Sequence, residues 1–407
     1  MHRRRFVHGG LSAAAAAAAG ALAGVGTRLY AAQPGDSGSA RFLLVFLRGG
    51  YDAASLLVPV SSDFYYASRP NIAVPRPSDA AGSALPLAAD WGLHPVLEDN
   101  VAQLALGRQA VFVPFAGTDD LTRSHFETQD SIELGQPLGG RRDYASGFMN
   151  RLAAALGARN AIAFTDQLPL CFRGPVQIGN VSLKAVGRYG IDARSRDLLA
   201  TMYRGQPLEA QVQEGFAVRD EVAREMAGEM QAANRNAISV KGFALEARRI
   251  GRLMRDKYNL GFIDVGGWDT HVNQGAASGY LASRLQELGR GLAGFADEMG
   301  QTVWRNTVVY VLSEFGRTFR ENGNRGTDHG HGSVHWVLGG GLAAANDKIA
   351  GEQVAIDERG LFQNRDFPVL NEYRAVLGGL LGRMYGLRDE ALAQVFPGAK
   401  AKDLRLV

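Results

Sequence analysis

The stretch RFLLVFLRGG, residues 41–50, sets the expected fold. Six consecutive apolar residues lie between two arginines, and two glycines follow. Four similar runs come later in the chain: AVFVPF at 110–115, LGFIDVGG at 260–267, TVVYVLSEFG at 307–316 and SVHWVLGGG at 333–341. Near-continuous apolar runs of this length predict strands that are covered on both faces, as in a parallel sheet.

Helical patterns lie between these runs. Apolar residues recur every three or four positions at 243–254 and at 281–299, and each series marks one apolar stripe of an amphipathic helix. Further helices are expected across 206–234 and 370–387. The alternation predicts an α/β fold with a mostly parallel sheet sandwiched by helices, and residues 33–407 are expected to form a single domain.

Residues 1–32 indicate export and are set apart from the fold. Positions 3–6 spell RRRF, a twin-arginine pattern of two arginines, any residue and then Phe. The weakly apolar run at 9–26 is rich in Ala and Gly, and small residues offer a cleavage site around Ala32. We expect a signal peptide read by the twin-arginine export machinery, and a periplasmic or otherwise extracytoplasmic folded protein. An uncleaved membrane anchor is the alternative.

Composition argues against several classes of protein. The net charge is +3, and subtracting the four leader arginines (Arg3, Arg4, Arg5 and Arg28) gives −1, so no basic nucleic-acid-binding face is indicated. No apolar run after the leader is long enough to span a membrane. The single cysteine, Cys171, excludes an internal disulfide, and its apolar surroundings predict a buried packing thiol.

Polar residues gather where the predicted strands end. Parallel strands bring their carboxyl ends to one edge of the sheet, where α/β proteins bind ligands. Ser124 and His125 are the candidate catalytic residues. The other candidates follow the same strands: Arg48, Arg123 and Arg317 for substrate binding, and Asp52, Asp264, Asp269, His271, Glu314, Asp328, His329 and His331 for metal binding.

These residue types suit a metal centre that acts on an anion. Imidazoles and carboxylates bind zinc and other divalent transition metals. Arginine forks onto phosphate or sulfate, and the adjacent glycines let the backbone approach closely or adopt positive φ. The stretch GTDHGHGSVHW at 326–336 concentrates such residues, and we expect a ligand loop there, with His335 in the core.

Each piece also has a purely structural reading. SHFE at 124–127 has the pattern of a helix capping box, in which Ser124 only starts a helix. Asp264 would cap a turn, and Glu314 with Arg317 would form a structural ion pair. The DHGH segment at 328–331 would be a polar turn.

The order of several motifs resembles a known family. After a twin-arginine leader come FLRGGYDAASLLVP, RSHFETQD, DVGGWDTH, LSEFGRT and GTDHGHG, as in the exported domain of unknown function 1501 family. The resemblance covers nearly the whole mature chain. In that family a glycine often follows the Asp of the first motif, where this chain has Ala53.

The family is similar in outline to the alkaline phosphatase and sulfatase superfamily, which implies an alkaline-phosphatase-like fold. By that similarity Asp52 would be the first-strand ligand and Ser124 the nucleophile. Asp264 or Asp269 would act with His271, and Glu314 with His329 and His331. The Asp-His pair of those enzymes directly follows the late strand, whereas here it falls at 328–329, so one metal or none remain alternatives to two.

The sequence therefore favours an exported, metal-dependent hydrolase of phosphate or sulfate esters, whose substrate is a small anionic ester. The alternative is a non-catalytic extracytoplasmic binding or assembly protein on the same fold. A third reading is a single structural metal that closes the 314–331 loop.

Overall fold

The computed structural model describes residues 40–139, 141–157, 160–181, 183, 193–217, 242–343 and 348–407. The expected signal peptide lies outside these residues, as does the part of the expected 206–234 helix after residue 217. Within them, no helix is both long and apolar enough to cross a membrane.

One large sheet forms the centre of the molecule, with the strand order β11-β5-β10-β9-β1-β8-β6-β7. The five predicted strands are confirmed as β1 (Arg41–Arg48), β5 (Ala110–Gly117), β8 (Leu260–Gly266), β9 (Thr307–Ser313) and β10 (Ser333–Leu338). β1 pairs in parallel with both β8 and β9. Three short strands complete the sheet: β6 (Ala161–Ala163), β7 (Gly179–Asn180) and β11 (Asn371–Glu372).

The strand β10 is the exception to the parallel arrangement. It pairs antiparallel with both β9 and β5, so the chain leaves β9 and re-enters the sheet at the same edge. The loop 314–332 therefore stays at the carboxyl ends of β1, β8 and β9. This places the GTDHGHG segment at the edge where the candidate site was expected.

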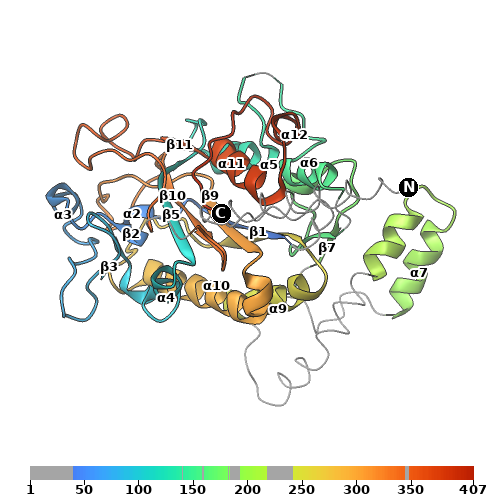
Figure 1. Ribbon diagram of the computed structural model, residues 1–407, viewed down its shortest axis with the longest axis horizontal. Coiled ribbons are helices and arrows are strands. Elements are labelled where there is room, and N and C mark those ends of the chain that lie inside the picture. The colour runs from blue at the N-terminus through green and yellow to red at the C-terminus, as the bar shows by residue number, and fades with distance from the viewer. Residues whose placement is uncertain are drawn as a thin grey trace, which may run out of the picture.

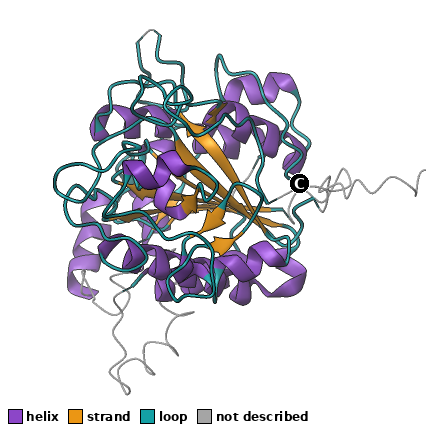
Figure 2. Ribbon diagram, turned by 90° about the vertical axis from the view of Figure 1, so that its left-hand side faces the viewer, coloured by secondary structure: helices purple, strands orange, loops and turns teal. Residues whose placement is uncertain are grey.

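Helices cover both faces of the sheet (Figures 1 and 2). One face packs against α4 (Val101–Leu106), α9 (Phe243–Asp256) and α10 (Tyr280–Trp304). The other packs against α5 (His125–Leu134), α6 (Phe148–Ala155), α11 (Tyr373–Tyr385) and α12 (Asp389–Val395). Along β1, the residues at 42, 44 and 46 enter the second core and those at 43, 45 and 47 the first. The unbroken apolar run of β1 follows from this two-sided burial, and the predicted α/β sandwich is confirmed.

Smaller elements fill the connections. A three-stranded sheet of β2 (Leu57–Val58), β4 (Gly92–Leu93) and β3 (Leu85–Pro86) lies beside α2 (Ala53–Leu56) and α3 (Asp63–Ser68). Two 3-10 turns span Pro95–Leu97 and Leu170–Phe172, and α7 covers Ala193–Tyr203. Cys171 and His335 are fully buried, as predicted.

A buried ion pair holds the end of β1 to the neighbouring loops. Asp52 precedes α2 and accepts two hydrogen bonds from the guanidinium of Arg69, and both side chains are buried. Arg69 also donates to the carbonyls of Phe319, over 2.6 Å, and Thr318, over 3.1 Å. Gln274 donates to Asp52 over 2.7 Å. The pair thus joins the first strand to the loops that follow β8 and β9.

Replacing Asp52 by Asn is expected to destabilise the fold by about 3–5 kcal/mol, because the buried charge of Arg69 loses its partner. Urea unfolding measures this difference. The control is Asp63→Asn, which removes an ion pair with Arg76 at a side chain that is 97% exposed and should cost at most about 1 kcal/mol. Equal losses in the two variants would contradict a stabilising role for the buried pair.

Acid should remove the advantage of the Asp52 carboxylate. Burial by itself would raise the pKa of Asp52, but Arg69 outweighs burial, so the pKa lies below its ordinary value of 3.8. A carboxylate whose pKa is lower in the folded protein than in the unfolded chain stabilises the fold fully at pH values above its unfolded-state pKa. This stabilisation is lost as the pH falls through its folded-state pKa. The stability gap between wild type and Asp52→Asn should be constant from pH 8 to 5 and narrow below about pH 4. A gap that already narrows between pH 7 and 5 would contradict this.

Candidate metal centre

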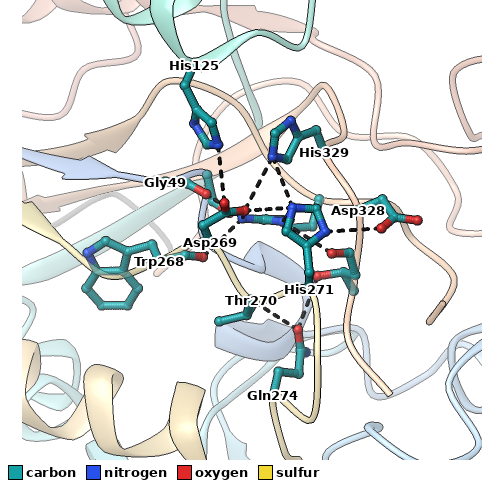
Figure 3. Close-up of polar contacts among 12 residues, drawn as sticks. Gly49, His125, Trp268, Asp269, Thr270, His271, Gln274, Asp328 and His329 are labelled. Carbon is teal, nitrogen blue, oxygen red and sulfur yellow. Dashed lines mark hydrogen bonds and ion pairs between the residues drawn. The ribbon is translucent and has the colours of Figure 1, made fainter. Parts of the chain in front are cut away.

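Three segments bring imidazoles and a carboxylate together at the carboxyl edge of the sheet (Figure 3). His125 is the first residue of α5, which follows β5. Asp269 and His271 lie just after β8, and His329 lies in the loop between β9 and β10. These residues are far apart in the sequence, and they meet because their strands end at one edge.

The spacing of the ligand atoms suits a metal ion. Among the described residues, one group of potential ligands emerges, His125, Asp269 and His329, with ligand atoms all within 4.8 Å of one another. Nε2 of His329 lies 3.3 Å from Oδ1 of Asp269, and Nε2 of His125 lies 3.5 Å from Oδ2. Ligand atoms about 2.0–2.1 Å from a tetrahedral zinc ion are about 3.3 Å apart. The group therefore has the dimensions of a metal site.

His271 borders this group. Its Nε2 atom lies 2.9 Å from Oδ1 of Asp269 and 3.2 Å from Nε2 of His329. It is therefore placed to act as a further ligand.

Each of the three rings has its Nδ1 atom against an acceptor. Nδ1 of His125 lies 2.8 Å from Oε1 of Glu314, and Nδ1 of His271 lies 3.1 Å from Oδ1 of Asp328. Nδ1 of His329 lies 3.0 Å from the carbonyl oxygen of Arg123. In the tautomer that donates from Nδ1 to these acceptors, the lone pair of each ring is on Nε2. Metal-ligating histidines are held in the same way by carboxylates and carbonyls.

The contact between His271 and His329 lies beside the guanidinium of Arg317, whose Nη1 atom is 3.4 Å from Nε2 of His271. With both Nδ1 atoms protonated, two Nε2 lone pairs face each other at 3.2 Å and repel. Either a shared proton or a cation next to both rings removes that repulsion. The donor set therefore fits a divalent metal, with protonation of one ring as the competing state.

Glu314 orients His125 and does not belong to the ligand group. Its Oε1 atom accepts from Nδ1 of His125 and, over 2.8 and 2.9 Å, from the amide of Gly49 and the side chain of Gln129. Its Oε2 atom accepts from Ser313 over 2.8 Å. Burial alone would raise the pKa of Glu314, but these hydrogen bonds outweigh it and lower the pKa. The ionised carboxylate in turn raises the pKa of His125.

Arg317 fastens the loops around the cluster. Its buried guanidinium donates to the carbonyls of Gly49, Gly50, Trp268 and Thr327 and to Oδ1 of Asp269. Burial alone would raise the pKa of Asp269, but Arg317 outweighs it and lowers the pKa. Because Oδ1 already contacts Arg317, Oδ2 is the less engaged oxygen of Asp269.

Arg48 and Asp264 pair with each other beside the cluster. Nε of Arg48 lies 2.7 Å from Oδ2 of Asp264, and its other nitrogens donate to Gln129 and Glu133 over 2.8 Å each. This network braces α5 against the ends of β1 and β8. The structure does not bring Asp264 into the ligand group.

Arg123 and Ser124 lie where α5 begins. The Arg123 guanidinium binds the buried carboxylate of Asp366, at 2.8 Å, and Gln363, while its carbonyl orients His329. Ser124 is the N-cap residue, as the capping-box reading expected, but within the described part of the chain its side chain makes no cap hydrogen bond. Its hydroxyl is therefore not committed to holding the helix.

Two further candidates lie outside the cluster. Asp52 is engaged with Arg69, as described above. His331 is buried with its ring 5.0 Å from the ring of Phe362, and burial lowers its pKa to about 4. Asp328 contributes as the partner of His271, with its other close contact to Asn322.

Glycines permit the close approach of the backbone here, as predicted. Gly49 has φ of 126°, and a Cβ there would lie 2.7 Å from the amide nitrogen of Asp269. A Cβ on Gly330 would lie 2.4 Å from the carbonyl carbon of Arg317. The absence of a side chain at both positions lets adjacent segments of the site pack closely, so a side chain at either would displace a ligand loop.

Sequence reasoning missed three supporting residues, Arg69, Gln129 and Gln274. Arg69 and Gln274 are buried around Asp52, and Gln129 lies one helical turn after His125. The four-residue spacing of His125 and Gln129 on a predicted helix is the one signal that was present. Nothing in the local pattern marks Arg69 or Gln274.

Comparison with known proteins supports the family resemblance. No match was found among curated proteins. Of the solved structures, the chain is similar to the one described as "Crystal structure of Ps i-CgsB in complex with k-i-k-neocarrahexaose", with 10% sequence identity, a TM-score of 0.38, and coverage of 89% of this chain and 75% of the other. The model of a family described as "Protein of unknown function (DUF1501)" matches residues 39–396. The chain therefore belongs to the DUF1501 family.

Proposed function

We propose that this protein is an exported, metal-dependent hydrolase of phosphate or sulfate esters. The observation that carries the proposal is the set of three imidazoles that direct Nε2 toward Asp269 while their Nδ1 atoms are held by acceptors. A metal site requires such a convergence of nitrogen and oxygen ligands, because their lone pairs must meet at the ion.

The residues present fit a divalent transition metal. His125, His329 and Asp269 would hold the ion, with His271 at the edge of the group, and nitrogen-rich ligand sets of this kind suit zinc or a related metal. A metal bound here would supply Lewis acidity toward the oxygens of an anionic ester.

The start of α5 is the proposed position of the substrate anion. The first-turn amides of a helix have no intrahelical acceptor and attract anions, and α5 begins at His125, inside the cluster. Ser124 lies directly before these amides. We propose its hydroxyl as the nucleophile, with attack by a water as the alternative. The guanidinium groups of Arg48, Arg123 and Arg317 have partners within the protein, so their proposed role is to position the site.

Export is part of the proposal. The RRRF pattern at 3–6 favours transport of the folded chain by the twin-arginine machinery, which places the site outside the cytoplasm. Export after folding is compatible with a metal that is loaded before transport.

One observation favours the second candidate, a non-catalytic binding or assembly protein. The Asp269 carboxylate is already neutralised by the buried guanidinium of Arg317. In that case the cluster would serve to organise the three loops.

Metal removal separates the two candidates. The mature chain, purified from cells that export it, is expected to hydrolyse an aryl phosphate or an aryl sulfate. Chelation and dialysis should remove at least 90% of the activity, a tenfold loss that corresponds to about 1.4 kcal/mol. Added zinc or another divalent transition metal should restore it. Turnover rates with and without added metal measure this. A folded protein without activity in any metal-loaded form would sink the hydrolase.

Two histidines of the same loop provide matched variants. His329→Ala removes a proposed ligand and should reduce activity by at least about 100-fold. His331→Asn, only two residues away but outside the cluster, should retain activity within about threefold provided that it folds. Equal losses in two variants of wild-type-like stability would show that the loop, and not the ligand set, matters.

Glu314→Gln tests the orientation of His125. The neutral amide weakens the acceptor for Nδ1, so metal affinity should fall by about 10–100-fold. Competition with a chromogenic chelator measures the change in dissociation constant. Asp264→Asn is the control at the same sheet edge, and because Asp264 pairs with Arg48 instead of a histidine, its metal affinity should stay within about threefold of wild type. Unchanged affinity in Glu314→Gln would contradict the positioning role.

A further inference from the structure

Exposed large apolar side chains adjoin residues of the polar cluster in the sequence. Phe126 follows His125 and is 85% exposed. Val272 follows His271, Leu121 lies in the loop that leads into α5, and both are more than half exposed. They come from two segments, the one that leads into and begins α5 and the loop after β8, and the cluster joins these segments because His125 and Asp269 belong to its ligand group.

Helix geometry places Phe126 at the margin of the site. On α5, His125 and Gln129 both contact Glu314, so this face of the helix is turned toward the cluster. Phe126 adjoins His125 in sequence and precedes Gln129 by three residues, which makes it a neighbour of that face on the helix surface. It lies in the first turn, at the carboxyl edge of the sheet.

The combination suits a substrate with two unlike parts. The helix start and the histidines would receive an anionic group, while the exposed ring of Phe126 offers apolar area to whatever adjoins that anion. An exposed phenyl ring gains free energy when a second apolar or aromatic surface covers it. A small alkyl ester offers much less apolar area to such a ring and would gain less free energy from it.

We propose that Phe126, with Leu121 and Val272, forms a rim that binds the organic group of the ester, so that the protein selects anionic esters of ring-containing or bulky apolar alcohols. This inference rests on the proposed function, because it takes the cluster as the place of the anion. Phe126 is the main specificity-determining residue.

Binding of non-hydrolysable analogues tests the rim directly. The metal-loaded mature chain is titrated in a calorimeter with phenylphosphonate and methylphosphonate, and with benzenesulfonate and methanesulfonate. The phenyl member of at least one pair should bind about tenfold more tightly than its methyl counterpart. Phe126→Ala should remove most of this preference and leave the affinity for the methyl compound unchanged.

Leu106→Ala is the matched control, since Leu106 is an exposed apolar residue of α4, on the opposite face of the sheet. It should leave the preference intact, and urea unfolding should show both variants to be as stable as wild type. Equal affinity for phenyl and methyl ligands, no binding of any of the four, or an unchanged preference in Phe126→Ala would overturn the rim. A phenyl preference without hydrolysis of any ester would support the rim and refute the hydrolase.

Discussion

The ion pair between Asp52 and Arg69 is the constraint on which the site depends. It is buried at the end of β1, where an unpaired charge would be costly. Arg69 reaches the carbonyls of Thr318 and Phe319, and Gln274 joins Asp52 to the loop after β8. The segments that carry His271 and His329 are thereby fixed relative to the sheet. Asp52, which by family resemblance would be the first-strand metal ligand, is instead paired with Arg69 and helps to hold the loops that carry the proposed ligands.

A second layer of contacts turns this fixed backbone into an oriented cluster. Glu314, Asp328 and the carbonyl of Arg123 each receive one Nδ1 atom, so the direction of each ring is set by a different segment. Arg317 closes the arrangement by binding the carbonyls of Gly49 and Gly50 together with Asp269. The chemistry proposed for the site follows from this arrangement, in which carboxylates and a carbonyl outside the ligand set determine where the ligands point.

The fold could be predicted because burial on both faces leaves an unbroken apolar run in each central strand, as in 41–48, and an apolar stripe in each covering helix. The edge that carries the site could be predicted for the same reason, since parallel strands end together. The antiparallel direction of β10 was not visible, because pairing direction leaves no mark in an apolar run. The roles of Asp52, Asp264 and Glu314 were also beyond the sequence. A carboxylate looks the same in a sequence whether its partner is a metal, an arginine or an imidazole, and the partners lie on distant segments.

The most direct measurement is X-ray diffraction from crystals of the exported protein, with data collected on both sides of the absorption edge of the bound metal. The account predicts an anomalous peak bounded by Nε2 of His125, Nε2 of His329 and the carboxylate of Asp269, which is lost in His329→Ala. A peak beside Asp52 or Asp264 instead, or none in crystals grown with excess zinc, would contradict the central claim that the oriented histidines form a metal centre.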